Sequence, residues 1–213
     1  MKWNWFKSWK RDVSVLVGII LVCAFAWFGA PTLFETLKTS MELPQSIPTS
    51  LNFEQQEKSQ KTIKELEKNL LRDQGQKGAT TIKLAYEYEQ LGLVQKAARM
   101  YRGQLRAQPH NAEILFALAR LYERAGQNEQ AQIYYEQSYD LSPSSRELYE
   151  HYAAFLITTS NDIERARGVY LNGLLQTHND AELIKQFVVF LEQYGYGYEA
   201  KLYKEYLKKV ASQ

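Results

Sequence analysis

A repeat of about 34 residues fills the chain from residue 78 onward and constrains its fold more than any other feature. Four alanines at spacings of 34, 35 and 34 mark the repeat: Ala97, Ala131, Ala166 and Ala200. Each is preceded by a residue that tolerates left-handed backbone, at Gly92, Gly126, Asn161 and Gly195. Each is followed by a tyrosine, at Tyr101, Tyr135, Tyr170 and, one position early, Tyr203. This period predicts antiparallel helix pairs that stack into an all-α solenoid, a fold that serves binding.

Within one unit, the residues predict two helices joined by a tight turn. Leu84 and Tyr88 lie four residues apart on one apolar helical face. Gly92 then supplies the left-handed residue that ends the first helix. Pro109 ends the second helix because it cannot donate a backbone hydrogen bond, and Asn111 is placed to cap the helix that follows.

Together, the turn, alanine, aromatic and proline positions resemble the tetratricopeptide repeat (TPR) family over residues 78–213. The resemblance implies four units that begin near residues 78, 112, 146 and 181. Two positions depart from the family pattern: Thr81 is small where the family has a large residue, and His178 replaces the closing proline. The last two units are also similar to the half-a-TPR variant, which implies an RNA-processing scaffold as an alternative function.

The N-terminal segment predicts a membrane anchor. Residues 13–30 contain no charge, and the run extended to residue 34 is long enough for a transmembrane helix. The tryptophans lie near its two ends, at Trp3, Trp5, Trp9 and Trp27. Basic residues crowd the tail 1–12, so the positive-inside rule predicts a cytoplasmic N-terminus. The protein is then single-pass in the inner (cytoplasmic) membrane, with its repeats on the periplasmic or external side. The small-x-small sequence Ala24-Phe25-Ala26 leaves a cleaved signal peptide, and hence a soluble TPR protein, as the alternative.

Two segments connect this anchor to the repeats. Residues 35–51 hold Pro44 and Pro48 among small polar residues and predict an extended linker. Residues 52–77 predict a charged helix with Ile63, Leu66 and Leu70 on one face. We expect this helix to cap the first repeat, in preference to forming a free dimerising coiled coil.

Charge and chemistry exclude several classes of function. The net charge is +2, and the first twelve residues carry four basic side chains against one acidic, which leaves −1 for the remainder. A near-neutral solenoid predicts no nucleic-acid partner. The three histidines, His110, His151 and His178, do not have metal-ligand spacing, and Cys23 is the only cysteine. The sequence therefore predicts no enzyme, catalytic residue, metal, cofactor or small-molecule substrate.

The TPR resemblance also implies where a protein or peptide partner binds, because the first helix of each unit lines a concave groove in that family. The partner-binding residues carried over in this way are Lys83, Tyr86, Phe116, Arg120, Arg124, His151 and Lys185. The same positions include Ile82, Glu89, Gln90, Glu113, Glu123, Glu147, Glu150, Ile157, Glu182, Gln186, Val189 and Glu192. Ile82 and Tyr86 replace the family's lysine and asparagine carboxylate clamp, so chaperone C-termini are not expected as partners. Aromatic and basic side chains together predict a partner with apolar anchors and some acidic character.

Finally, the order of anchor, linker and repeats is similar to bacterial inner-membrane TPR proteins of cytochrome c maturation and of secretion-linked chaperoning. This layout implies a membrane-anchored adaptor or scaffold, acting as a chaperone or assembly factor for a membrane or exported complex.

Overall fold

The computed structural model describes residues 43–72, 77–141 and 144–211. The chain divides between Leu43 and Pro44 into two units, and the described helices all belong to the second, Pro44–Gln213. The predicted cytoplasmic tail, transmembrane helix and first part of the linker lie outside the described residues. Of the helices that are described, none combines the length and the apolar character needed to cross a membrane.

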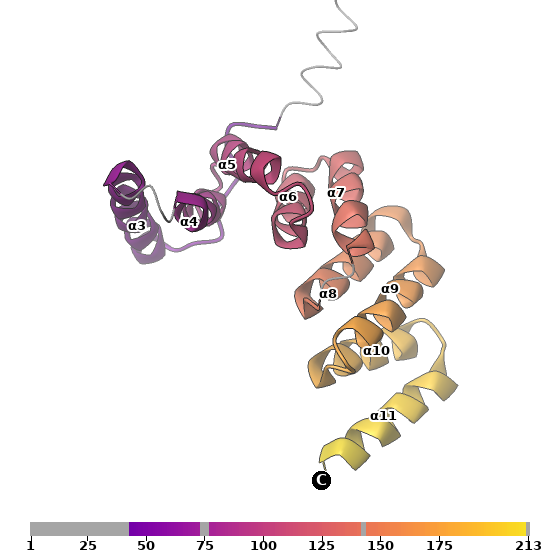
Figure 1. The fold of residues 1–213 in the computed structure, drawn as a ribbon. Helices are drawn as coiled ribbons and strands as arrows, with labels where there is room; N and C mark the ends of the chain where they lie inside the picture. The colour runs from indigo at the N-terminus through magenta and orange to yellow at the C-terminus, as the bar shows by residue number, and fades with distance from the viewer. Residues whose placement is uncertain (1–42, 73–76, 142–143, 212–213) are drawn as a thin grey trace, which may run out of the picture. The chain divides into compact units, whose positions relative to one another are not determined.

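The described part of the second unit is built of helices, as the repeat predicts (Figure 1). Helix α3 (Phe53–Arg72) comes first and packs on α4. Four antiparallel pairs follow: α4 (Lys77–Gln90) with α5 (Val94–Ala107), α6 (Ala112–Arg124) with α7 (Asn128–Asp140), α8 (Arg146–Phe155) with α9 (Ile163–Gln176), and α10 (Ala181–Gln193) with α11 (Gly197–Ala211). The second helix of each pair also packs on the first helix of the next. The predicted all-α helix-pair solenoid is confirmed.

The repeated small residues lie where the sequence places them. The four repeat alanines are 0–2 % exposed, because the helices of a pair approach closely at these points. Three glycine turns have left-handed backbone, with φ of 71° at Gly92, 74° at Gly126 and 87° at Gly195. Asn161 takes the same conformation, with φ of 50°, and thereby replaces the glycine of the third unit.

The third unit contains one extra residue, and the end of α8 absorbs it. The turn residues Gly92, Gly126, Asn161 and Gly195 are spaced by 34, 35 and 34 positions, so the extra residue lies between Gly126 and Asn161. Gly126 and Gly195 follow the first residues of α6 and α10 by fourteen positions, whereas Asn161 follows the first residue of α8 by fifteen. A π-helical turn, Leu156–Ser160, occupies the end of this helix. The wider hydrogen-bonded ring of a π-turn accommodates an inserted residue inside a helix. The alanine spacing of 35 at this point therefore has a local structural cause.

His178 departs from the proline pattern for a reason that the backbone shows. His178 and its neighbour Asn179 have φ of 54° and 61°. A proline ring holds φ near −65°, so proline is incompatible with this turn. Asp180 comes next and caps α10 by accepting hydrogen bonds from the backbone N–H groups of Glu182 and Leu183.

The segment before α3 is bonded to the first repeat. Residues 43–52 form neither helix nor strand. The N–H of Ile47 donates to the carbonyl of Gly92 at 2.9 Å, and the hydroxyl of Thr49 donates to the carbonyl of Gln90 at 2.6 Å. A Cβ on Gly92 would lie 2.1 Å from the carbonyl oxygen of Ile47, so this turn requires glycine for space as well as for conformation. The later part of the predicted linker therefore packs against the α4–α5 turn.

A polar pair joins the two helices within three of the units. The Tyr101 hydroxyl donates to Glu89, and the Tyr135 hydroxyl donates to Glu123 at 2.6 Å. In the fourth unit, Lys204 replaces the tyrosine of this register and binds Glu192. The two members of each pair are twelve residues apart in the sequence.

Candidate partner-binding groove

A hollow of about 530 Å³ lies where α3, α4 and α6 converge, with one residue contributed by α5. Its lining is formed by Thr62, Leu66, Ile82, Lys83, Tyr86, Glu87, Tyr101, Glu113, Ile114 and Ala117. Tyr86 is 50 % exposed, so its ring is accessible to a partner. Apolar side chains with a few charged groups among them are typical of surfaces that bind peptides.

Helix α3 forms one wall of this hollow through Thr62 and Leu66. The helix is held in place by its buried Ile63 and by the Tyr88 hydroxyl, which donates to the Glu67 carboxylate at 2.6 Å. Burial, followed by the interaction with Glu67, raises the pKa of Tyr88 to about 12. We expected α3 to cover the first repeat, and its contribution to a binding surface was missed. The signal for it was the spacing of Ile63 and Leu66 on one helical face.

Glu89 differs from its predicted place on the open groove, because its side chain is only 2 % exposed. Its carboxylate accepts a hydrogen bond from Tyr101 at 3.2 Å. Two guanidinium groups of the next unit approach the same carboxylate, Arg124 at 3.3 Å and Arg120 at 3.8 Å. A buried carboxylate is costly unless it is paired and hydrogen-bonded, and Glu89 is both. It joins the first two units at the base of the groove.

Four residues predicted for the groove lie together where the first unit meets the second and where the second meets the third. They are Phe116, Arg120, Arg124 and His151. Arg120, whose partner is Glu89, also lies over the ring of Phe116, 5.7 Å from its centroid. The ring of Phe116 in turn packs near the rings of Tyr135 and His151, with centroid-to-centroid distances of 6.1 Å and 5.7 Å. Burial, and then the charge of Arg120, lowers the pKa of His151. This favours a neutral imidazole near Arg120.

The predicted residues of the first unit lie next to this cluster. Tyr86 and Lys83 line the hollow, as does Tyr101. Burial raises the pKa of Tyr101, the Glu89 carboxylate raises it further, and smaller effects of Arg120 and Tyr86 act on the same hydroxyl. Tyr101 therefore connects the hollow, which it lines, to Arg120, because both Tyr101 and Arg120 interact with Glu89.

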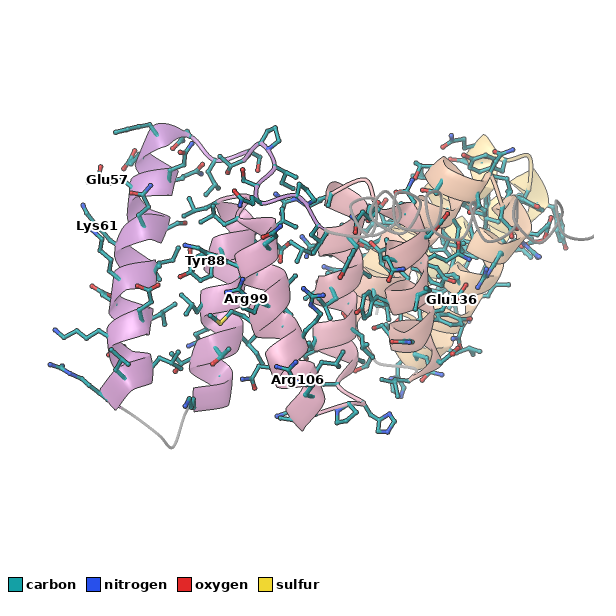
Figure 2. The ribbon with its side chains drawn as sticks, turned by 90° about the horizontal axis from the view of Figure 1, so that it is seen from above. Glu57, Lys61, Tyr88, Arg99, Arg106 and Glu136 are labelled. Atoms are coloured by element: carbon teal, nitrogen blue, oxygen red, sulfur yellow. The ribbon has the colours of Figure 1, made fainter. Side chains whose placement is uncertain are left out.

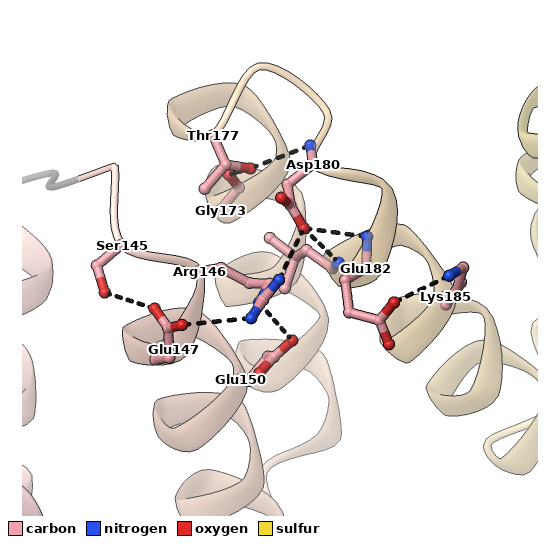
Figure 3. Close-up of polar contacts among 10 residues, drawn as sticks. Ser145, Arg146, Glu147, Glu150, Gly173, Thr177, Asp180, Glu182 and Lys185 are labelled. Atoms are coloured by element: carbon pink, nitrogen blue, oxygen red, sulfur yellow. Dashed lines mark hydrogen bonds and ion pairs between the residues drawn. The ribbon is translucent and has the colours of Figure 1, made fainter. Parts of the chain in front are cut away.

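Lys185, by contrast, is part of a separate ion-paired cluster. Its ammonium binds Glu182 at 2.9 Å (Figure 3). Figure 3 also shows Arg146 at the start of α8 between three carboxylates, those of Glu147 at 3.3 Å, Glu150 at 3.4 Å and Asp180 at 3.8 Å. Because Asp180 caps α10, Arg146 links the first helices of the third and fourth units. Four of the side chains predicted for these units, those of Glu147, Glu150, Glu182 and Lys185, are engaged in these ion pairs.

In the described ranges, no group of three or more histidine, cysteine, aspartate or glutamate side chains could hold a metal ion. The groove offers ring faces, aliphatic side chains, guanidinium groups and carboxylates. This set is suited to recognising a polypeptide.

Comparison with known proteins places this arrangement among repeat proteins. Residues 112–155, which cover α6, α7 and α8, match the tetratricopeptide repeat family model. No curated protein sequence matches the chain.

Solved structures extend the similarity to most of the chain. BtubC from P. vanneervenii is 17 % identical with a TM-score of 0.58, over 75 % of each chain. The TPR-like repeats of a putative kinesin light chain from P. anserina are 16 % identical with a TM-score of 0.55, over 74 % of this chain and 89 % of theirs. PilW, a type IV pilus biogenesis factor, is 19 % identical with a TM-score of 0.52, over 64 % of this chain and 63 % of its own. The chain thus contains a tetratricopeptide repeat within a TPR-type helical scaffold, a fold suited to protein–protein interaction.

Proposed function

We propose that this protein is a membrane-anchored adaptor that holds a segment of a partner protein in the hollow between α3, α4 and α6. The observation that carries the proposal is the half-exposed ring of Tyr86 in a hollow that also contains Leu66, Ile82 and Lys83. An aromatic ring in a concave apolar site is a common anchor point for a bound polypeptide. Binding, and not catalysis, is the role that we assign to the chain.

The partner segment carries an apolar side chain and an acidic group. The apolar side chain fills the space beside Tyr86 and Leu66. Arg120 and Arg124 share the buried Glu89, but their side chains remain 34 % and 30 % exposed. They can therefore also bind a carboxylate at the edge of the site.

In the cell, residues 13–34 anchor the protein in the inner membrane, with the N-terminus in the cytoplasm and the repeats in the periplasm. The adaptor then acts as an assembly factor or chaperone for a membrane or exported complex, such as the machinery of cytochrome c maturation. The similarity to a pilus biogenesis factor supports a role in assembly through its fold alone.

Copurification tests the binding role. The full chain is isolated from native membranes in a mild detergent, and its partners are compared between the wild type and Tyr86→Ala. The matched control is Ile133→Ala, which removes an exposed apolar side chain from α7, outside the hollow. The proposal expects loss of a specific partner with Tyr86→Ala alone. Retention of every partner by both variants would place binding outside this groove.

Protease accessibility tests the topology. Protease added to intact spheroplasts is expected to degrade the repeats and to leave the tail 1–12 protected. Repeats that survive until the membrane is permeabilised would overturn the export proposal and would favour the intracellular half-a-TPR alternative.

A further inference from the structure

Helix α5 carries an exposed basic surface on the side away from the groove. Its members are Lys96, Arg99, Arg102 and Arg106, which are all exposed. Their spacings of three, three and four residues place them on one side of the helix. Tyr101, which lines the groove, lies on the opposite side of the same helix. We refer to these four residues as the α5 basic face, along which Figure 2 labels Arg99 and Arg106.

The charge of this face is not neutralised within the described residues. Helix α5 contains no acidic residue. Arginines of α6, α8 and α9 all form ion pairs: Arg120, Arg124, Arg146, Arg165 and Arg167. Across ranges 43–72, 77–141 and 144–211, no ion pair includes a member of the α5 basic face. Five of the nine arginines that the structure describes are ion-paired, whereas Arg99, Arg102 and Arg106 remain available to an external ligand. The ammonium of Lys96 lies over the ring of Tyr88, 5.1 Å from its centroid.

The C-terminal half of the face borders a second hollow. This hollow has a volume of about 410 Å³ and is lined by Arg102, Leu105, Arg106, Pro109, Leu115 and Gln137. Two guanidinium groups therefore adjoin an apolar surface contributed by α5, α6 and the loop between them. The Nε–H of Arg102 donates to the carbonyl of Ala98 at 3.3 Å, which orients its side chain and leaves the terminal nitrogens free to bind a carboxylate.

We propose that the α5 basic face binds an acidic polypeptide segment with one apolar side chain. Carboxylates of the segment pair with the arginines, for which the planar guanidinium is well suited. The apolar side chain enters the hollow beside Leu105 and Pro109. This surface is separate from the groove and does not depend on the function proposed for it.

A nucleic acid fits this surface less well than an acidic peptide. Helix α7 repeats the position of α5 one unit later, and it contains no basic residue. Its exposed acidic side chains, Glu129 and Asp140, lie 34 residues after Gln95 and Arg106. A phosphate backbone that continued from α5 onto α7 would therefore meet like charges, whereas a short peptide would end before them.

The test measures binding of a fluorescein-labelled peptide of six glutamates around one central leucine. The full chain is held in an uncharged detergent, and fluorescence anisotropy gives the affinity. The paired substitution Arg102→Glu and Arg106→Glu is expected to weaken binding at least tenfold. The matched control, Lys201→Glu with Lys208→Glu, makes the same charge change on exposed positions of α11 and is expected to change affinity less than twofold.

Further measurements test the roles of the peptide's charge and of its leucine separately. A peptide with glutamine in place of glutamate is expected not to bind, and alanine in place of the leucine is expected to weaken binding at least threefold. When Tyr86→Ala has already disabled the groove, Arg102→Glu with Arg106→Glu is still expected to weaken binding at least tenfold, so failure of this proposal is distinguishable from failure of the groove. Arg102→Gln with Arg106→Gln repeats the test with a milder change, should the charge reversal disturb the helical circular dichroism.

Three results would overturn the inference. Equal losses in the α5 and α11 variants would show that net charge alone attracts the peptide. An unlabelled twenty-nucleotide oligouridylate that displaces the peptide and binds more tightly would identify the face as a nucleic-acid surface. Absence of peptide binding to the wild type at low salt would exclude an acidic segment of this kind.

Discussion

Arg124 lies 3.3 Å from the carboxylate of Glu89, thirty-five residues earlier, and so joins the second repeat to the first. The carboxylate is buried, whereas the side chain of Arg124 is 30 % exposed. Glu89 is therefore part of the packing between the two units, whereas Arg124 also reaches the surface beside the groove. The proposed function thus couples stability to binding at this point, because a ligand that engages the arginine also acts on a residue that holds two units together.

Glu89→Gln is expected to lower the free energy of unfolding by about 1–3 kcal/mol, because it removes a charge-assisted hydrogen bond and leaves two arginines less well paired. Glu192→Gln removes the equivalent carboxylate of the fourth unit, which is 51 % exposed, and is expected to cost less than about 1 kcal/mol. Chemical denaturation of the full chain in detergent, followed by circular dichroism, provides the comparison. Equal losses would show that burial of Glu89 is not important for stability.

Gly92→Ala is expected to destabilise the protein more than Gly195→Ala. Both glycines have left-handed backbone, which costs an alanine about 1–2 kcal/mol. Only at Gly92 does the new Cβ meet a neighbouring backbone atom, the carbonyl oxygen of Ile47, whereas nothing lies within 4 Å at Gly195. Gly92→Ala should also release residues 44–51 from the α4–α5 turn, which limited proteolysis can detect. If the two variants melt alike and are cut alike, this segment does not depend on the turn.

Deletion of Thr159 is expected to be tolerated, because this residue is exposed in the π-helical turn that absorbs the additional residue of the third unit. The deletion restores the distance of fourteen positions from helix start to turn that the second and fourth units have, and allows regular α-helical hydrogen bonding. Deletion of Gln193 at the end of α10 shortens a helix that has no extra residue, and is expected to lower the melting temperature. Thermal unfolding of both deletion variants decides whether the π-turn holds the insertion.

Buried tyrosines make the fold sensitive to alkali. Burial raises the pKa of Tyr149, Tyr152 and Tyr170 to about 12, above the ordinary value of 10. The unfolded chain binds fewer protons than the folded chain in this range, so stability is complete below pH 10 and is lost as the pH rises toward 12. We expect tyrosinate absorbance at 295 nm to rise in two phases, with the second coinciding with loss of helical circular dichroism. Ionisation of all fifteen tyrosines near pH 10 with the helices intact would contradict this.

Much of the fold could be predicted because local chemistry and repeat spacing agree. Asn161 was identified as a left-handed turn residue from its place in the repeat, and its φ of 50° confirms it. The extra residue of the third unit was visible as a spacing of 35, but not its location, since a π-turn leaves no distinct residue pattern.

The candidate site was less predictable, because it depends on how neighbouring units meet. Glu89 has the helical position of a groove residue, yet two arginines of the next unit enclose it with Tyr101. Helix α3 contributes Leu66 to the hollow, although it lies outside the repeat that guided the prediction. Contacts of this kind follow from three-dimensional packing and not from sequence spacing.

Photocrosslinking within native membranes tests the central claim most directly. The photoreactive residue p-benzoylphenylalanine is placed at Tyr86, inside the hollow, and in a matched variant at Ile133, which is 45 % exposed on α7. We predict one dominant crosslinked protein from position 86, none from position 133, and loss of the crosslink when Leu66→Glu is added to the same wall. The same crosslinked protein at equal yield from both positions, or none from position 86, would contradict a partner-binding role for this groove.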